Sequence, residues 1–267
     1  MFDLPTLEAS LAGTPFAGKL HFVPVTDSTN TDALEAARSG APHGSVYFAD
    51  QQLAGRGRGD HAWQSPSGQG LYVSVILRPQ IPAARLPLLP LAAGLAAADA
   101  IRTAAGLTVD LRWPNDLLIG PRKTGGILLE ANVSSRSLRH AVVGIGINVH
   151  QRSFDPTLST PATSLDIETV RTVSRQSLLV SLLKSLQREA LTLDHPAAET
   201  TIPRRVEQAS TWVRGKRVEV HGPQACTGVT AGLDRHGFLL INTTNGQVTV
   251  QTGGIRAAEA AKDVAGT

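Results

Sequence analysis

The stretch SVYFADQQLAGRGRGDHAWQSPSGQGLYVSVIL, residues 45–77, places two β-rich runs on either side of a loop that carries GRGRG at 55–59. Residues 45–50 and 71–77 are rich in β-branched and aromatic side chains, which predicts two strands of one sheet joined by this loop. The glycines ease unusual backbone angles, while Arg56 and Arg58 offer planar donors that match phosphate and carboxylate groups. The pattern therefore suits a loop that wraps an anion, although short Gly/Arg runs also occur as plain surface loops.

The rest of the first 213 residues predicts strands grouped around one helix, followed by two further helices. Residues 27–40 contain the start and stop signals of a short helix: Ser28 or Thr29 as N-cap, Asp32 in the first turn and Gly40 just after the end. An edge strand is expected at 19–25, strands at 109–113 and 117–119, apolar runs at 127–133 and 141–149, and helices at 88–105, 178–193 and 202–213. This order favours an α+β fold with a mixed β-sheet.

The composition of the chain changes near Arg214. Residues 215–255 read as four or five short strands separated by turns such as DRHG at 234–237 and TNG at 244–246, which is typical of a small β-barrel. We therefore divide the chain into a domain at 1–213 and a second domain at 214–267. Residues 153–163 are expected to form a surface loop, and the last residues, from 257 on, a frayed tail.

Composition excludes several classes of protein. The apolar run 86–105 is interrupted by Pro87, Pro90, Asp99 and Arg102, so it reads as a buried helix and not as a membrane span. With one cysteine and no signal-like N-terminus, we expect a cytoplasmic protein. A net charge of +3 is too small to argue for nucleic acid. The eight histidines show no metal-ligand spacing, so no structural metal is expected.

Two motifs carry candidate chemistry. LRWPNDLLIG at 111–120 followed by PRKTGGILLE at 121–130 places Asp116 and Lys123 at the two ends of a tight hairpin. A carboxylate and an amine then face one region, although RWPND can be merely a turn and Lys123 merely a surface lysine. VVGIGINV at 142–149 is a strand interrupted by Gly144 and Gly146, which indicates a close approach to its backbone.

Five segments together resemble the biotin protein ligases: DSTN at 27–30, QLAGRGRG at 52–59 with Trp63, RWPND at 112–116, RKTGGILLE at 122–130 and GIGINV at 144–149. The resemblance implies a catalytic domain like that of class II aminoacyl-tRNA synthetases, followed by a small SH3-like β-barrel. It also implies a two-step reaction. Biotin and ATP, with Mg²⁺, give biotinyl-5′-AMP, and the biotinyl group then passes to one lysine of a biotin carboxyl carrier protein.

The same resemblance assigns expected roles to individual residues. Arg58 and Lys123 would touch the biotin carboxylate or the α-phosphate, and Asp116 would orient the acceptor lysine or take its proton. The three form the expected catalytic set. The biotin site would comprise Ser28, Thr29, Asn30, Gln52, Arg56, Gly57, Arg58, Lys123, Gly126, Gly144 and Gly146. The adenylate site would comprise Arg56, Arg58, Trp63, Asn115, Lys123 and Asn148, with Mg²⁺ near Asn148.

Two alternatives stay open from the residues. A lipoate or octanoate ligase also forms an acyl-adenylate, but its ligand has no ureido group with which Ser28, Thr29 and Gln52 could form hydrogen bonds. A nucleic-acid-binding protein could use the Gly/Arg loop, although aromatic residues make up only 4% of the chain. Only 26 residues precede DSTN, too few for a helix-turn-helix domain, so no nucleic acid and no membrane are expected as partners. The sequence leaves monomer and homodimer equally open.

Overall fold

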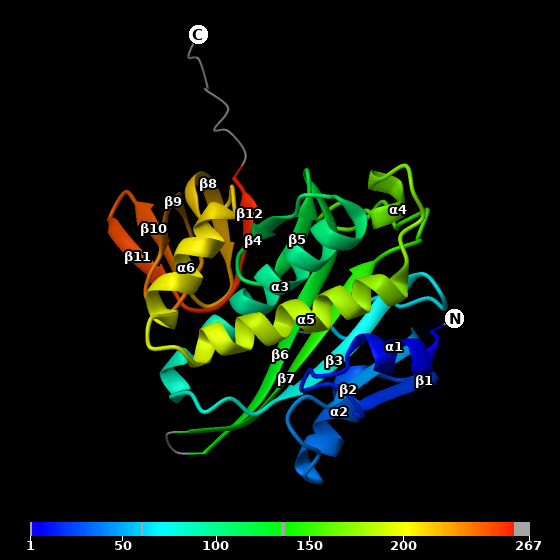
Figure 1. Cartoon of the computed structure of the whole chain (residues 1–267). Coiled ribbons are helices and arrows are strands. Elements are labelled where there is room, and N and C mark those ends of the chain that lie inside the picture. Colours follow the sequence, from blue (N-terminus) through cyan, green and yellow to red (C-terminus); the bar gives the residue numbers. More distant parts are fainter. Residues whose placement is uncertain (1, 60, 135–136, 259–267) are drawn as a thin grey trace.

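The computed structural model describes residues 2–59, 61–134 and 137–258, which form two β-sheets and the helices packed against them (Figure 1). The larger sheet has seven strands in the order β1-β2-β3-β7-β6-β5-β4. These strands are β1 (Leu20–Thr26), β2 (Val46–Gln52), β3 (Gly70–Leu77), β4 (Asp110–Arg112), β5 (Asp116–Ile119), β6 (Arg122–Ser134) and β7 (Ser137–Asn148). Among the described strands of this sheet, β1 and β2 alone pair in parallel, so the predicted mixed sheet and the edge position of the first strand are both confirmed.

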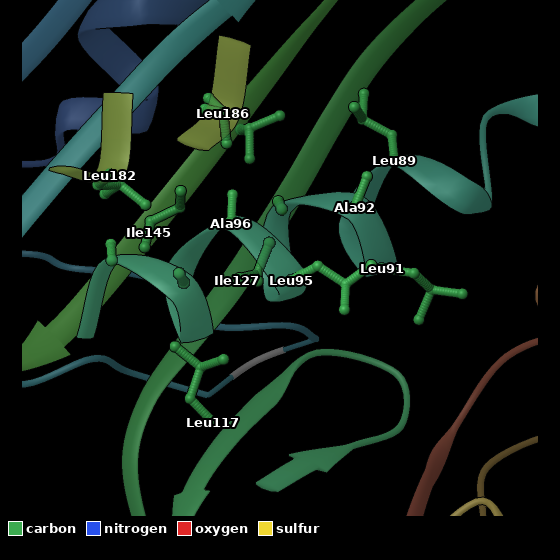
Figure 2. Close-up of a cluster of buried hydrophobic side chains, with 14 of the residues drawn as sticks. Leu89, Leu91, Ala92, Leu95, Ala96, Leu117, Ile127, Ile145, Leu182 and Leu186 are labelled. Carbon is green, nitrogen blue, oxygen red and sulfur yellow. The ribbon is translucent and has the colours of Figure 1, made fainter. Parts of the chain in front are cut away.

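Helix α3 (Leu88–Ala105) lies between the sheet and α5 (Arg175–Asp194) and forms the centre of the core. Figure 2 shows Leu95 and Ala96 of α3 in one cluster with Leu117, Ile127 and Ile145 of the sheet and Leu182 and Leu186 of α5. Of the described helices, α3 alone is long and apolar enough to suit a membrane span, and 67% of it is buried inside the protein. It serves here as a core helix.

Helix α2 (Thr29–Arg38) packs on the opposite face of the sheet. Its Ala33 and Ala37 contact Ile76 of β3 and Val142 of β7. Because side chains alternate along a strand, the other residues of β3 and β7 that share the parity of Ile76 and Val142 also face α2. That face of the sheet, beyond the end of α2, carries the site described below.

The remaining helices of the first 213 residues are short or peripheral. They are α1 (Leu4–Ser10), the 3₁₀ turn η1 (Ala83–Arg85), α4 (Leu165–Glu168) and α6 (Ala198–Gln208). The expected helix at 202–213 is wrong at its C-terminal end. It ends at Gln208 because the next residues bond to β4: Leu111 N–H donates to Ala209 O, and Ser210 Oγ donates to Leu111 O.

A second sheet begins at Arg214. It has five strands in the order β11-β10-β9-β8-β12, all antiparallel. The strands are β8 (Arg214–His221), β9 (Cys226–Leu233), β10 (Leu239–Thr243), β11 (Gly246–Val250) and β12 (Gly254–Ala257). This sheet is tied to the first body by the indole N–H of Trp113, which donates to Gly237 O at 3.0 Å. Most of the expected frayed tail, from residue 259 on, lies outside the described residues.

Candidate active site

A cavity of about 980 Å³ opens on the α2 face of the large sheet. Its floor includes Ser74 of β3 and Gly144, Gly146 and Asn148 of β7, which all have the parity expected for that face. One wall comes from the start of α2 and the Gly/Arg loop. The opposite wall comes from the β4–β5 turn, the segment 151–162 and the edge of the second sheet. Segments far apart in the sequence thus meet around one hollow.

The Gly/Arg loop lines this cavity with residues 56–59 and 61–63, and backbone hydrogen bonds join its two sides. Gly57 N–H donates to His61 O at 2.7 Å and Trp63 N–H donates to Gly55 O at 2.8 Å. The two arginines of the loop point to different partners. Arg56 pairs with Glu130 at 2.8 Å, while Arg58 Nη1 donates to Gly253 O of the second sheet at 2.8 Å. The loop therefore bridges both bodies of the protein.

Arg58 lies deeper than Arg56. Burial lowers the pKa of its guanidinium, and the Asp116 carboxylate acts in the opposite direction. Since an arginine stays charged at any ordinary pH, Arg58 places a partly desolvated positive charge in the cavity. A partly desolvated guanidinium attracts an anion more strongly than a guanidinium that is fully exposed to water.

A row of hydrogen-bonding side chains lies at the start of α2. Ser28, Thr29 and Asn30 are each less than 5% exposed and line the cavity. Ser28 is the N-cap of α2, yet its side chain makes no capping hydrogen bond. Gln52 Oε1 accepts from Thr29 N–H at 3.0 Å, and Gln52 Nε2 donates to Ser65 Oγ at 2.7 Å. Thr29 and Gln52 are thus held in place by hydrogen bonds within the protein and present fixed polar atoms to a ligand.

Asp116 and Lys123 meet, as the hairpin predicts. Lys123 Nζ lies 2.5 Å from Asp116 Oδ1, while Arg112 donates to Asp116 Oδ2 through Nε at 3.0 Å and through Nη2 at 2.6 Å. Burial raises the pKa of the Asp116 carboxyl, but the charges and hydrogen bonds of Lys123 and Arg112 outweigh burial and hold this pKa below its usual value. Asp116 is therefore an ionised carboxylate that holds two cations.

The glycines of the cavity floor are approached closely by protein side chains. A Cβ on Gly146 would overlap the indole of Trp63, and a Cβ on Gly144 would overlap the side-chain amide of Asn30. Trp63 also lies above Gly126, and Lys123 Nζ lies 5.5 Å from the centre of its ring. The indole Nε1 of Trp63 is buried without a hydrogen-bond partner. The close approach expected from the glycine pattern is present, with Trp63 and Asn30 as the approaching groups.

The two remaining predicted residues are both anchored. Asn115 Nδ2 donates to Ile127 O at 2.7 Å, which fixes the β4–β5 turn to β6. Asn148 is 5% exposed, and its Nδ2 donates to Thr163 O at 3.0 Å, so its Oδ1 is the atom left for the cavity. With Gly57, which also lines the cavity, every predicted site residue is brought to this one place.

Sequence reasoning missed several residues of the site. The segment 153–163, predicted as a surface loop, docks on Lys123: Lys123 N–H donates to Pro161 O, and Thr163 N–H donates to Lys123 O. It lines the cavity with Phe154 and Thr160, among others, so it is also a wall of the site. Arg112 stands within the RWPND motif, where its ion pair with Asp116 could have been suspected. His221 and Arg256 come from the second sheet and give no sequence signal.

The cavity is strongly positive. The described residues that line it include five cationic side chains, those of Arg56, Arg58, Arg112, Lys123 and Arg256, and one carboxylate, that of Asp116. Within the described part of the chain, no three His, Cys, Asp or Glu side chains are grouped so that they could hold a metal ion. The site is suited to an elongated anion whose polar, uncharged end reaches the Ser28–Thr29–Gln52 row.

Comparisons with known proteins agree with this geometry. The model of the "Biotin/lipoate A/B protein ligase family" matches residues 22–148. A biotin–[acetyl-CoA-carboxylase] ligase of Mycobacterium tuberculosis is 33% identical over 253 residues, which cover 89% of this chain and 88% of that protein. A solved biotin protein ligase of Aquifex aeolicus, in complex with biotin and ATP, is 29% identical with a TM-score of 0.75, covering 90% of this chain and 100% of the other.

Another relative is a bifunctional ligase/repressor, BirA, of Bacillus spizizenii, 42% identical over 161 residues. That match covers 60% of this chain and 50% of the relative, so the chain spans about half the length of this Bacillus protein. The Mycobacterium relative, in contrast, is matched over most of its length. On these matches, and on a cavity that unites all five sequence motifs, the chain belongs to the biotin/lipoate A/B protein ligase family.

Proposed function

We propose that this protein is an ATP-dependent biotin protein ligase. It joins biotin to the α-phosphate of ATP, releases pyrophosphate, and transfers the biotinyl group from biotinyl-5′-AMP to one lysine of a biotin carboxyl carrier protein. The observation that carries the proposal is the cavity itself, which is lined both by the hydrogen-bonding side chains of Ser28, Thr29 and Gln52 and by the cations Arg58 and Lys123. The ureido ring of biotin can form hydrogen bonds with these polar side chains, and its carboxylate can pair with the two cations. The Mycobacterium and Aquifex relatives bear the names of such ligases.

In the first step, attack of the biotin carboxylate on the α-phosphate brings negative groups together. Arg58 and Lys123 supply positive charge where it is needed, and both are preorganised by protein contacts before the ligand arrives. Trp63 offers a flat face for the adenine. The hairpin of the Gly/Arg loop shields the adenylate, which hydrolyses in water, until a carrier lysine enters.

Mg²⁺ fits this site as an ion that arrives on the ATP phosphates. Asp116, the one carboxylate among the described lining residues, is already engaged by Arg112 and Lys123, so it is a poor ligand for a metal. Asn148 Oδ1 is a neutral oxygen of the kind that completes a magnesium shell made mainly of phosphate and water. The ion would neutralise phosphate charge during the transfer.

The domain assignment is part of the same proposal. Residues 1–213 are the catalytic domain, related to that of class II aminoacyl-tRNA synthetases, and residues 214–267 are a small SH3-like barrel that closes one side of the site. We place the protein in the cytoplasm, where its carrier would be, with no nucleic acid as partner. Either a monomer or a homodimer is compatible with the geometry.

Isothermal titration calorimetry with biotin and with lipoate separates the proposed function from its nearest rival. We expect biotin to bind at least tenfold more tightly, because lipoate leaves the buried polar row unpaired. Lipoate binding as tight as biotin binding would make the protein a lipoate or octanoate ligase instead. A gel shift with DNA or RNA that needs neither ligand and falls steeply with salt would favour a nucleic-acid-binding protein.

Gly144→Ala is expected to weaken biotin binding by about tenfold or more, which corresponds to about 1.4 kcal/mol. The new Cβ would overlap Asn30, which carries the hydrogen bonds behind Thr29. Calorimetry with biotin measures the effect. Gly94→Ala is the matched control, because a Cβ there meets only ordinary contacts of 3.6 Å or more. Unchanged biotin affinity in Gly144→Ala would mean that Asn30 does not support the biotin site.

A further inference from the structure

A chain of hydrogen bonds begins at Glu130 and leads through Asn30 and Ser74 to Thr29, one of the polar side chains that line the cavity. Glu130 Oε2 accepts from Asn30 Nδ2 at 2.7 Å and from Arg56 Nη2 at 2.8 Å. Asn30 Oδ1 in turn accepts from Ser74 Oγ at 2.7 Å, and Ser74 Oγ lies 2.8 Å from Thr29 Oγ1. Ser74 is fully buried and Asn30 is 4% exposed, so neither can turn to water for a replacement partner.

The direction of each bond in this chain follows from Glu130. A carboxylate only accepts, so Asn30 must turn its NH₂ group toward Glu130 and its oxygen toward Ser74. Ser74 has one hydroxyl proton, which it gives to Asn30. It therefore has no proton for Thr29, and the Thr29 oxygen receives nothing from Ser74.

The hydroxyl proton of Thr29 is also committed inside the protein. Both of its neighbours can accept it: Ser74 Oγ at 2.8 Å, and Gln52 Oε1 at 3.1 Å. Gln52 Oε1 cannot donate in return, since it is a carbonyl oxygen. What Thr29 offers to the cavity is thus a hydroxyl oxygen with free lone pairs, which can only accept a hydrogen bond.

We propose that Glu130 is a positioning residue for ligand binding: it keeps the Ser74 proton turned away from Thr29, so that Thr29 Oγ1 can accept an N–H of a cyclic urea such as biotin. The inference rests on the proposed function. Arg56 acts through the same oxygen, because its guanidinium balances the charge of Glu130 beside the buried amide of Asn30. Without Glu130, the Asn30 amide is free to turn its NH₂ group toward Ser74. The Ser74 proton then takes one of the two lone pairs of Thr29 Oγ1, so the ligand N–H finds fewer free approach directions on this oxygen.

The test uses Glu130→Met and Glu130→Ala, whose side chains cannot accept hydrogen bonds, and measures biotin affinity by calorimetry. Both are expected to bind biotin about tenfold more weakly, since Ser74 then competes with the ligand N–H for the lone pairs of the Thr29 oxygen. Glu130→Gln, which can still accept from Asn30, should bind biotin within about threefold of wild type. Glu199→Met is the matched control, because Glu199 pairs with Arg85 at a similar exposure and lies outside the cavity.

The double variant Glu130→Met/Ser74→Ala distinguishes the proposed role of Glu130 from a merely structural one. The quantity measured is again the biotin affinity. Ser74→Ala alone is expected to weaken biotin binding, because it leaves the buried Asn30 Oδ1 without its donor. In the Ser74→Ala background, however, no Ser74 proton is left to turn toward Thr29, so Glu130→Met should add little further loss. A full additive loss in the double variant, or an undiminished affinity in the Glu130 variants, overturns the inference. Failure of wild-type protein to bind biotin would instead overturn the proposed function.

Discussion

Lys123→Ala is expected to lower the rate of biotinyl-adenylate formation by about 10²–10³-fold, the usual cost of removing a charged group that stabilises a transition state. Lys123 pairs with Asp116 and lies over the ring of Trp63. In the proposed function it stabilises the charge that develops between the biotin carboxylate and the α-phosphate. The variant should still fold, because Arg112 continues to pair with the buried carboxylate of Asp116. The measurement is the single-turnover rate of adenylate formation at saturating biotin and ATP.

The control for this prediction is Lys216→Ala. Lys216 lies over the ring of Trp212 at 5.0 Å, much as Lys123 lies over Trp63, but it is outside the cavity. Lys216→Ala should therefore form adenylate at the wild-type rate. If Lys123→Ala kept a rate within about threefold of wild type while folding normally, the developing negative charge would have to be stabilised elsewhere, and the proposed role of Lys123 would be wrong.

Asp116→Asn is expected to reduce transfer to the carrier lysine by about 10²-fold while reducing adenylate formation by less than about tenfold. The free amine of the acceptor is the nucleophile, and a carboxylate beside it can orient the amine or take its proton. The two steps are separated by supplying preformed biotinyl-5′-AMP and following biotin incorporation into the carrier. Equal losses in both steps would remove Asp116 from the second step.

The pH dependence of transfer separates the two roles left open for Asp116. Because the pKa of this carboxyl is held below its usual value, Asp116 is fully ionised at neutral pH and is a weak proton acceptor. We therefore expect Asp116 to orient the amine, and the transfer rate to rise steadily from about pH 6 to pH 9 as the acceptor lysine loses its proton. An inflection in this range that disappears in Asp116→Asn would show that Asp116 acts as a general base.

The sequence-based predictions succeeded where the contacts are local. The Asp116–Lys123 pair follows from a hairpin of two strands adjacent in the chain, and the length of α3 follows from a long alanine/leucine run that ends at Gly106, a left-handed C-cap. The N-cap of helix α2 is Ser28, one of the two predicted candidates, although its side chain makes no capping hydrogen bond. Each of these features depends on residues close in the chain.

Predictions failed where distant segments decide the structure. Helix α6 ends early because β4 binds the residues after Gln208, a contact that no local pattern contains. Arg58 donates a hydrogen bond to Gly253, which is 195 positions away in the sequence, and Arg56 pairs with Glu130, which is 74 positions away. The segment 153–163 is the predicted surface loop and is exposed at most of its positions, but nothing in its sequence indicates the pairing of Ala162 with Lys123. Such contacts depend on the order of strands in the sheet, which composition and periodicity leave open.

The exchange of labelled pyrophosphate into ATP, measured with purified protein and Mg²⁺, tests the central claim most directly. If the protein activates biotin as an adenylate, exchange should require biotin, saturate with it, and fall sharply in Lys123→Ala. Biotin-independent exchange, or no exchange at all from folded wild-type protein with biotin present, would contradict the assignment of this cavity as a biotin-activating site.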